Sequence, residues 1–310
     1  MCTAIKYGNL FGRNFDLDFE FEQNILFTAR DFEIPGRNTP ALKNHYSIMG
    51  MGVISQDFPL YYDAMNEKGL AIAALNFPGF AIYSNTIKNQ ENIAAFEVIP
   101  FVLGKNKSID EAVEYIKTVN ITNVPFSKKY PTTPLHWMLS DKERSVVIEV
   151  VSGKVNIYES SADILTNAPS YDIQLFNLSN YMSLSPNPPK NSFSQVLPLS
   201  TYSFGMGGMG LPGDLSSMSR FVKGTFLLHN SPAFKSTEQA KTHFFRLLYS
   251  VSMTKGAVQT ESSKTEYTQY TCCMDLEKLS YTFTSYDQLE PKEYFLADVC
   301  SSKKGLVYSP

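Results

Sequence analysis

The sequence predicts an α+β fold in which layers of β-sheet are covered by helices, and two observations lead to this prediction. Strand-like runs dominate residues 1–160 and return at residues 266–286, whereas helical patterns come in separate blocks. This order differs from the regular alternation of strands and helices in a doubly wound fold. No repeat, low-complexity tract or linker divides the chain, so residues 1–310 are expected to form one domain with a loose tail from about residue 300.

The first predicted element is a β-hairpin. Residues 2–7 and 10–16 have the composition of strands, and Gly8-Asn9 between them is a two-residue turn signal. In such a hairpin the second strand returns along the first, which brings Arg13 and Asp16 back towards the start of the chain.

Cys2 is the first candidate catalytic residue because it directly follows the initiator methionine. If Met1 is removed, Cys2 carries both a thiol nucleophile and an α-amine that can act as its base. A cation such as Arg13 lowers the pKa of a thiol, and a carboxylate such as Asp16 can hold an ammonium group. The sequence therefore offers an N-terminal nucleophile; the alternative is that Cys2 is an ordinary small residue of the first strand.

Further strands are expected wherever β-rich runs are bounded by turn residues. The run at 146–151 is almost continuously apolar, which suits a strand covered on both faces. Asn76 and Asn167 each end a strand close to a proline, where asparagine is often only a turn former. The strands expected after the hairpin are 24–30, 46–54, 60–65, 70–77, 135–141, 145–151, 154–159, a short one near 164–166, 266–274 and 279–286.

Helices are predicted from apolar residues that recur at helical spacing. Ser108 and Glu111 form a capping box at the start of the second one. Asp214 is the expected N-cap of the helix that carries Arg220. The expected helices are 94–103, 108–120, 171–181, 215–228 and 237–253.

A long segment at 183–213 separates the third and fourth predicted helices and is rich in proline and glycine. A loop of this length in a compact domain is usually functional or disordered. Its glycine run lacks the spacing of a phosphate-binding loop, whereas Phe204, Met206 and Met209 make it apolar. The expectation is a flexible lid over an apolar substrate.

Composition excludes several classes of function. A net charge of −3 gives no basic surface for nucleic acid or membranes. No apolar run approaches the roughly 18 residues of a membrane-spanning helix, and the first residues lack the pattern of a signal peptide, so a cytoplasmic location is expected. The four histidines and four cysteines lack the spacing of a metal site. Apart from Cys2, the cysteines are expected to be buried thiols, namely Cys272, Cys273 and Cys300.

A set of short stretches in a fixed order adds a further argument. The set is Met1–Ile5, Phe11–Asp16, Tyr61–Leu70, Leu75–Phe77, Pro134–Trp137, Leu165–Pro169 and Gly210–Asp214 with Ser219–Phe221. Together these motifs resemble the choloylglycine hydrolase family, which contains conjugated bile acid hydrolases and penicillin V acylases. The resemblance covers residues 1–290 and implies a four-layer αββα sandwich of two mainly antiparallel sheets, the fold of N-terminal-nucleophile hydrolases. It also implies a homotetramer, in which segment 183–213 belongs to the assembly region, and no cofactor.

The resemblance implies that Cys2 attacks an amide carbonyl. Its free α-amine accepts the thiol proton and later passes a proton to the leaving amine. Arg13 is implied to stabilise the thiolate, and Asp16 to orient the amine.

Three further residues acquire roles through the resemblance. Asn167 and Asn76 are implied to form the oxyanion hole, where preorganised donors are usually the largest catalytic contribution. Arg220 is implied to lie near Cys2 and to support the developing charge.

The implied substrate is a bile acid joined by an amide bond to glycine or taurine. A steroid needs a mostly apolar pocket, for which aromatic and methionine-rich segments are the candidates. Close bile acid hydrolases often carry Tyr-Ser-Arg-Gly where this chain has Tyr-Ser-Phe-Gly at 202–205, so a cation that could meet the substrate's anionic end is absent. The predicted substrate-binding residues are Phe19, Phe21, Phe77, Phe80, Phe204 and Met206.

Three alternative functions remain open at this point. A penicillin V acylase would use the same catalytic residues with a different pocket. A glutamine amidotransferase also uses Cys2 but needs an acceptor domain, and the 310 residues fit one hydrolase domain. A binding protein without turnover is the non-enzymatic alternative, and the intact catalytic set argues against it.

Overall fold

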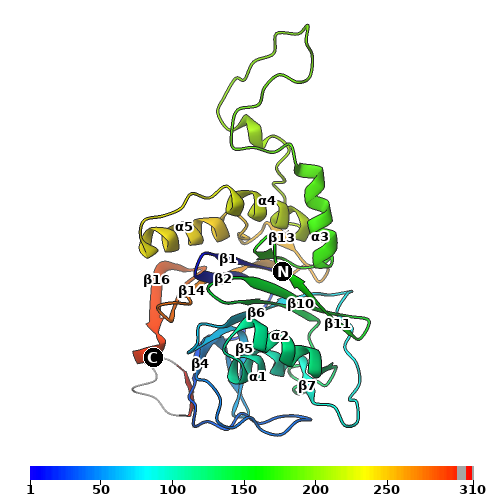
Figure 1. Cartoon of the computed structure of the whole chain (residues 1–310), viewed down its shortest axis with the longest axis vertical. Coiled ribbons are helices and arrows are strands. Elements are labelled where there is room, and N and C mark those ends of the chain that lie inside the picture. Colours follow the sequence, from blue (N-terminus) through cyan, green and yellow to red (C-terminus); the bar gives the residue numbers. More distant parts are fainter. Residues whose placement is uncertain (299–304, 309–310) are drawn as a thin grey trace.

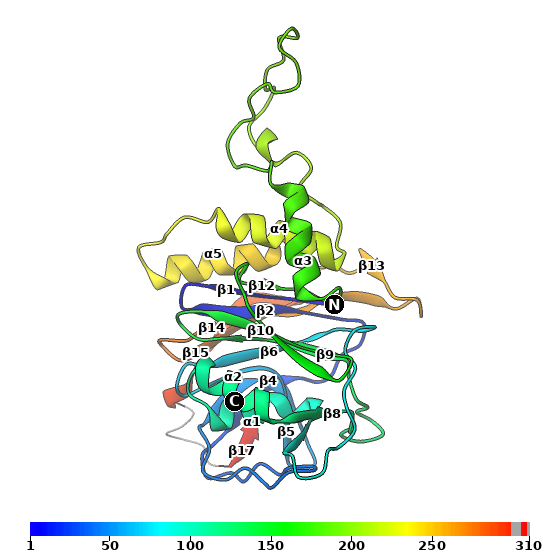
Figure 2. The ribbon, with the colours of Figure 1, turned by 45° about the vertical axis from the view of Figure 1, so that its right-hand side comes forward.

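The computed structural model of the chain describes residues 1–298 and 305–308 and has four layers (Figure 1). Figure 2 shows the layers edge-on: helices cover one sheet, this sheet faces a second sheet, and two helices cover the far side of the second. The strand pairs within these two sheets are all antiparallel in the described part of the chain. The αββα sandwich implied by the sequence is therefore confirmed.

The predicted N-terminal hairpin lies within the first sheet. β1 (Cys2–Tyr7) pairs with β2 (Leu10–Leu17) so that Ala4 lies opposite Arg13. The strand order is β12-β1-β2-β14-β15-β16, with β13 paired to β14. The remaining strands are β12 (Ile164–Leu165), β13 (Val258–Gln259), β14 (Thr265–Asp275), β15 (Ser280–Ser285) and β16 (Gln288–Phe295).

The helix layer on the first sheet contains two helices that pack on its strands and a third that packs against one of them and extends away from the sheet (Figure 1). They are α3 (Tyr171–Leu178), α4 (Ser217–His229) and α5 (Thr237–Tyr249). α5 packs on β2 and β14, and α4 packs on β1 and β12.

The second sheet has the order β11-β10-β9-β6-β5-β4-β3-β17. α1 (Val98–Lys105) packs on β5 and β6, and α2 (Ile109–Thr118) packs on α1. The strands are β3 (Asn24–Thr28), β4 (Ile48–Ser55), β5 (Phe58–Asn66), β6 (Ala71–Asn76), β9 (Leu135–Ser140), β10 (Ser145–Val151), β11 (Lys154–Glu159) and β17 (Leu306–Tyr308). A separate parallel pair is formed by β7 (Asn92–Ala94) and β8 (Asn120–Thr122), and short 3₁₀ turns lie at Ala95–Glu97, Ser179–Tyr181 and Met206–Gly208.

Alternating side chains of the second sheet contribute to two hydrophobic clusters. On β6, Ala73 and Leu75 belong to the cluster that they share with β1 and β2, whereas Ile72 and Ala74 belong to the cluster under α1 and α2. Successive side chains of a strand point to opposite faces, so both faces of this sheet are buried. The double coverage predicted for the apolar run 146–151 on β10 is confirmed for residues 146–150, which are all buried, whereas Val151 at the strand end is half-buried.

Two predicted helix caps need correction. α4 begins at Ser217 and is capped by Ser216, not by Asp214. The Asp214 carboxylate instead accepts hydrogen bonds from the Ser216 backbone and the Ser219 hydroxyl, at 2.9 and 2.6 Å. In α2 the predicted cap is half formed: the Ser108 hydroxyl accepts from Glu111 N, but the Glu111 carboxylate accepts from the backbone of Lys107.

The C-terminal region also differs from the expectation. Leu306–Tyr308 pairs with β3 as β17, so these residues are not a loose tail. The exposed edge strand β16 was not predicted, because its polar sequence and Pro291 do not resemble a buried strand. The predicted buried thiol Cys300 and the rest of the tail, 299–304 and 309–310, lie outside the described residues.

No helix among residues 1–298 and 305–308 is long and apolar enough to cross a membrane.

Candidate active site

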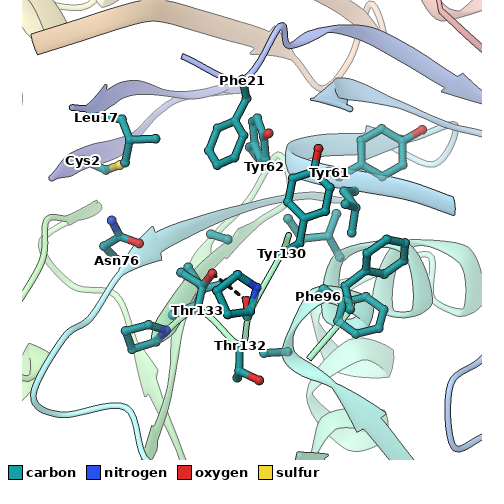
Figure 3. A pocket seen from close by; sticks show the side chains of 18 of the residues that line it. Cys2, Leu17, Phe21, Tyr61, Tyr62, Asn76, Phe96, Tyr130, Thr132 and Thr133 are labelled. Carbon is teal, nitrogen blue, oxygen red and sulfur yellow. Dashed lines mark hydrogen bonds between the residues drawn. The ribbon is translucent and has the colours of Figure 1, made fainter. Parts of the chain in front are cut away.

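A cavity of about 370 Å³ lies beside Cys2 and is lined by both sheets, by α1 and by the chain around residues 124–134 (Figure 3). Its walls are mostly apolar, which suits an apolar ligand. The polar side chains at the end near Cys2 are few, and Asn76 is one of them. The large apolar and aromatic lining residues include Phe15, Leu17, Phe19, Phe21, Tyr61, Tyr62, Phe96, Phe126, Tyr130 and Trp137.

Cys2 is the first residue of β1 and is only 2% exposed. Its backbone N–H donates to Asn167 Oδ1 at 2.8 Å, and its thiol lies 3.9 Å from the carbonyl oxygen of Asp16. The Met1 amine donates to the same Asp16 carbonyl at 2.9 Å and pairs with the Glu266 carboxylate. Burial lowers the pKa of this Met1 amine from its ordinary value of 8.0.

Arg13 reaches from β2 in the first sheet to the second sheet and is fully buried. Its Nη1 donates to the carbonyl oxygens of Ala74 and Tyr62, at 2.5 and 3.2 Å. Burial opposes the charge of the guanidinium, but Cys2, Tyr270 and Asp63 outweigh this and raise the pKa of Arg13 above its ordinary value. The guanidinium is therefore a permanent cation beside the thiol.

Asp16 is a buried carboxylate at the end of the same strand. Its Oδ1 accepts a hydrogen bond from the Thr268 hydroxyl at 2.6 Å, whereas its Oδ2 is buried and has no hydrogen-bond partner among the described residues. Burial raises the pKa of Asp16, although Arg220 and the nearby amine oppose this shift. One carboxylate oxygen thus remains available for an N–H donor.

Asn167 connects the catalytic candidates that lie far apart in the sequence. Its Oδ1 accepts from Cys2 N and from Arg220 Nη2, the latter at 2.7 Å, and its Nδ2 donates to the backbone oxygen of Asn76 at 2.7 Å. Arg220 in turn donates from Nη1 to Cys2 O and Thr3 Oγ1, each at 2.6 Å. The structure therefore brings all six predicted catalytic residues into one site.

A profile of the linear amide C–N hydrolases, choloylglycine hydrolase family, matches residues 2–299 of the chain. The chain belongs to this family. A relative, the bile salt hydrolase/transferase of Lactiplantibacillus plantarum, is 45% identical over 290 residues, which cover 93% of this chain and 90% of that protein.

Two solved structures place the fold within the same group. A mutant of the conjugated bile acid hydrolase from Clostridium perfringens superposes with a TM-score of 0.90 and 33% identity, covering 100% of this chain and 97% of that chain. Penicillin V acylase from Agrobacterium tumefaciens superposes with a TM-score of 0.78 at 20% identity, covering 99% of this chain and 90% of that chain, which shows a shared fold. This member of the choloylglycine hydrolase family is thus a linear amide hydrolase with the N-terminal-nucleophile fold.

The predicted substrate-binding residues fall into two groups in this choloylglycine hydrolase family member. Phe19 and Phe21 line the cavity. Phe77 and Phe80 do not line it: the Phe77 ring is fully buried, lies 4.2 Å from that of His136 and stacks on Phe80 at 5.2 Å. Phe77 therefore supports the strand end that carries Asn76.

Phe204 and Met206 form the second group and also lie outside the cavity. They belong to segment 183–213, which extends away from the helix layer in Figures 1 and 2, and Phe204 is 97% exposed. The prediction that this segment is a lid over the substrate is therefore wrong within one chain. The cavity is lined by strands of other parts of the chain and not by segment 183–213. The aromatic and methionine side chains that lie close together in this segment were therefore a misleading indication of substrate binding.

Several residues that position the site were missed. Ser217 Oγ accepts from Asn167 N at 2.9 Å, and Gln174 Nε2 donates to Asn167 O at 3.3 Å. His136 Nε2 lies 2.9 Å from the carbonyl oxygen of Thr166. His136 is fully buried, and its contacts to this carbonyl and to Glu149 involve both ring nitrogens, as in a satisfied core histidine. No sequence signal distinguished Ser217 or Gln174.

The remaining described cysteines are inert by comparison with Cys2. Cys272 and Cys273 are fully buried free thiols, as predicted, and burial raises the pKa of each well above the ordinary value of 9.0. A thiol held in this protonated form is a poor nucleophile. In the described part of the chain, no group of three or more His, Cys, Asp or Glu side chains is placed to hold a metal ion.

Proposed function

We propose that this chain hydrolyses the amide bond between a bile acid and glycine or taurine, with Cys2 as nucleophile. The observation that carries the proposal is that Cys2, Arg13 and Asn76 meet at one end of an otherwise largely apolar cavity. The names of the relatives from L. plantarum and C. perfringens support this substrate class.

Excision of Met1 is the proposed first step, because it frees the α-amine of Cys2. The nitrogen already donates to Asn167 Oδ1. A free amine carries additional N–H donors, and the unpartnered Oδ2 of Asp16 is a buried acceptor close enough to interact with the chain terminus. Asp16 is therefore proposed to orient the amine so that its lone pair faces the thiol.

The proposed reaction needs only the chain and water. The amine takes the thiol proton, and Sγ attacks the amide carbon to form a tetrahedral intermediate. Collapse breaks the C–N bond, and the ammonium gives its proton to the leaving nitrogen of glycine or taurine. Water, deprotonated by the same amine, then attacks the thioester and releases the bile acid and the free thiol.

The proposed charge stabilisation comes from four preorganised groups. Arg13 faces the thiolate, and the Asn76 side chain lies beside Cys2 in the cavity wall (Figure 3). Asn167 and Arg220 hold the Cys2 backbone from the other side. Donors fixed before the reaction act without reorganising, which is why such groups are effective.

The substrate class is tested by comparing products from three amides. Purified protein, whose intact mass shows the loss of Met1, is incubated with glycocholate, taurocholate and penicillin V. We expect release of glycine or taurine at a higher kcat/KM than release of phenoxyacetate. A preference for penicillin V would replace the proposal by the penicillin V acylase alternative, and turnover of none of the three would favour the binding-protein alternative.

Asp16→Asn is predicted to lower activity while it raises stability. Asparagine keeps the shape of the side chain and an acceptor for Thr268 but removes a buried charge. We expect turnover to fall by about 10²-fold, because the amine loses its anionic partner. The melting temperature at neutral pH is expected to rise, because burial disfavours the ionised carboxylate.

The direction of the pH dependence follows from the raised pKa of Asp16. A raised folded-state pKa contributes stability that is present below the ordinary value of 3.8 and is lost as the pH rises through the folded value. The increase in melting temperature of Asp16→Asn over the parent should therefore be absent at acid pH and should grow as the pH rises. Asp57→Asn, in an exposed turn with φ of 57°, is the control and should change neither property. A lower melting temperature of Asp16→Asn at neutral pH would contradict the prediction.

We further propose that the protein is a homotetramer of single-domain, cytoplasmic protomers and that segment 183–213 makes the contacts. Phe193, Val196, Tyr202 and Phe204 on this segment are each at least 82% exposed. Apolar side chains gathered in this way usually mark an interaction surface. Light scattering should give the mass of four chains, and replacing the segment by a short glycine–serine linker should give smaller species. A monomeric parent protein would refute the assembly.

A further inference from the structure

Asp63 on β5 is a fully buried carboxylate that the proposed reaction does not use. Its Oδ2 accepts a hydrogen bond from the Tyr270 hydroxyl at 2.5 Å. Its Oδ1 accepts from the Tyr281 hydroxyl at 2.5 Å and lies 3.6 Å from the Cys272 thiol. The three donors belong to β14 and β15 of the first sheet. The Asp63 side chain therefore extends from the second sheet to a set of hydrogen-bond donors on the first.

The Arg13 side chain extends the opposite way, from the first sheet towards the second. Arg13 lies opposite Cys272 in the pairing of β2 with β14, and its Nη1 donates to the carbonyl of Tyr62, the residue before Asp63. Phe15 fills the space nearby, with its ring 5.0 Å from that of Tyr270 and 4.9 Å from the Arg13 guanidinium carbon. The two opposite charges thus share one aromatic, water-excluded region.

Arg13 needs a counter-charge in this region. Its hydrogen bonds go to backbone carbonyls, and Nη2 is buried without a hydrogen-bond partner among the residues that the structure describes. A buried charge is costly unless another charge balances it. Before the thiol ionises, Cys2 cannot provide this balance. The titratable and charged groups around Cys2, Arg13 and Asp63 are the amine, Asp16, Arg220, Glu266, Tyr270, Cys272 and Tyr281.

Among the carboxylates of that group, Asp63 acts most strongly on the charge of Arg13. Asp16 attracts the amine and Arg220 more strongly than Arg13, and Glu266 pairs with the amine. Burial raises the pKa of Asp63, but Arg13 is the strongest influence that opposes this, and Asp63 in turn raises the pKa of Arg13. The two groups therefore stabilise each other's charged forms.

We propose that Asp63 is a positioning residue for Arg13: it is the buried counter-charge of the guanidinium and limits the positive field that Arg13 exerts on the Cys2 thiol. The inference rests on the proposed role of Cys2 as nucleophile. If Asp63 loses its charge, it no longer offsets the positive field that Arg13 exerts on the Cys2 thiol. The thiol then ionises at lower pH, and the resulting thiolate is a weaker nucleophile, because nucleophilicity falls with the pKa of the thiol.

The test compares Asp63→Asn with the parent by the rate at which iodoacetamide alkylates Cys2, followed by mass spectrometry across a series of pH values. We expect the midpoint of this profile to fall by about one pH unit, as one unscreened charge at an effective dielectric of about 20 implies. The acid limb of kcat/KM for glycocholate should move in the same direction. Where the thiol is fully ionised, kcat/KM should fall by about threefold.

Glu97→Gln is the matched control. Glu97 is also fully buried, but it accepts hydrogen bonds from the backbone of Ala94 and Arg37, and its neighbour Val98 belongs to the hydrophobic cluster under α1 and α2. Its replacement removes a buried charge without altering the surroundings of Arg13, so the alkylation midpoint should stay at that of the parent. This control separates a specific effect on the thiol from a general loss of stability.

Tyr281→Phe provides a second variant, which keeps the carboxylate but removes one of its donors. It should shift the midpoint downward by less than Asp63→Asn does. A midpoint in folded Asp63→Asn that equals or exceeds that of the parent would overturn the inference; if that variant does not fold, an unchanged midpoint in Tyr281→Phe would do so. Alkylation needs no substrate, so a parent that hydrolyses no amide would refute the proposed function without affecting this measurement.

Discussion

Cys2→Ala is expected to reduce kcat for conjugated bile acid hydrolysis by about 10⁴-fold or more, because no acyl-enzyme can form without the thiol. The variant keeps the α-amine, Arg13 and both asparagines, so any remaining rate would measure what these groups do for direct attack by water. Substrate should still bind, since the cavity walls are unchanged. The measurement is amino acid release under single-turnover conditions, with substrate affinity determined separately.

Cys273→Ala is the control for this substitution. Cys273 lies on β14, is fully buried and belongs to the same hydrophobic cluster as Cys2, but it does not line the cavity. Its loss should cost only the packing of one small side chain, about 1 kcal/mol, and leave kcat unchanged. Cys2→Ala that turns over at more than a hundredth of the parent rate would show that Cys2 is not the nucleophile.

The fold explains why the second residue of the chain can occupy this position. β1 is an interior strand of the first sheet, between β2 and β12, so backbone hydrogen bonds hold it along most of its length. Arg220 fixes its first carbonyl, and Asn167 fixes the N–H of Cys2. A chain end is usually poorly ordered unless it is tied down in this way. The same contacts that order the terminus therefore orient the proposed nucleophile.

Local sequence patterns were sufficient for the part of the site built by the hairpin. The two-residue turn at Gly8-Asn9 sets the register of β1 and β2, and Gly8 adopts φ of 59° there. Once the register is set, Arg13 and Asp16 must return alongside the start of β1. These residues could be placed near Cys2 from the sequence because a period of two and a tight turn leave little choice.

The other half of the site depends on contacts over long sequence separations. Asn167 and Arg220 meet Cys2 only because β12 pairs with β1 and α4 packs on both strands. Their turn and surface patterns are common, and only the family resemblance indicated their roles. The cavity shows the same limit: Phe19 and Phe21 follow β2 and were identified, whereas the apolar Phe204 was assigned to the cavity although its segment points away from the body.

Asn167→Ala is expected to have the second largest effect and to lower kcat by about 10²–10³-fold. The carboxamide makes three contacts at once: it accepts from Cys2 N and Arg220 Nη2 and donates to the carbonyl of Asn76. Alanine removes all three, so the proposed oxyanion donor is lost and the nucleophile, the guanidinium and the end of β6 lose their common anchor. The cavity lining does not include Asn167, so KM should change much less than kcat.

Asn167→Asp separates these two contributions because it keeps both acceptor contacts and removes the N–H donor. If donation to the oxyanion is the larger part, Asn167→Asp should be as slow as Asn167→Ala. If anchoring of Cys2 and Arg220 is the larger part, it should retain most of the parent rate, with the new carboxylate paired to Arg220. Asn180→Ala, in the exposed 3₁₀ turn Ser179–Tyr181 that follows α3, is the control and should leave kcat unchanged. A kcat of Asn167→Ala equal to that of the parent would remove Asn167 from the mechanism. In that case β1 pairing would be enough to hold the Cys2 backbone, and the contacts to Thr3 and Leu215 would be enough to hold Arg220.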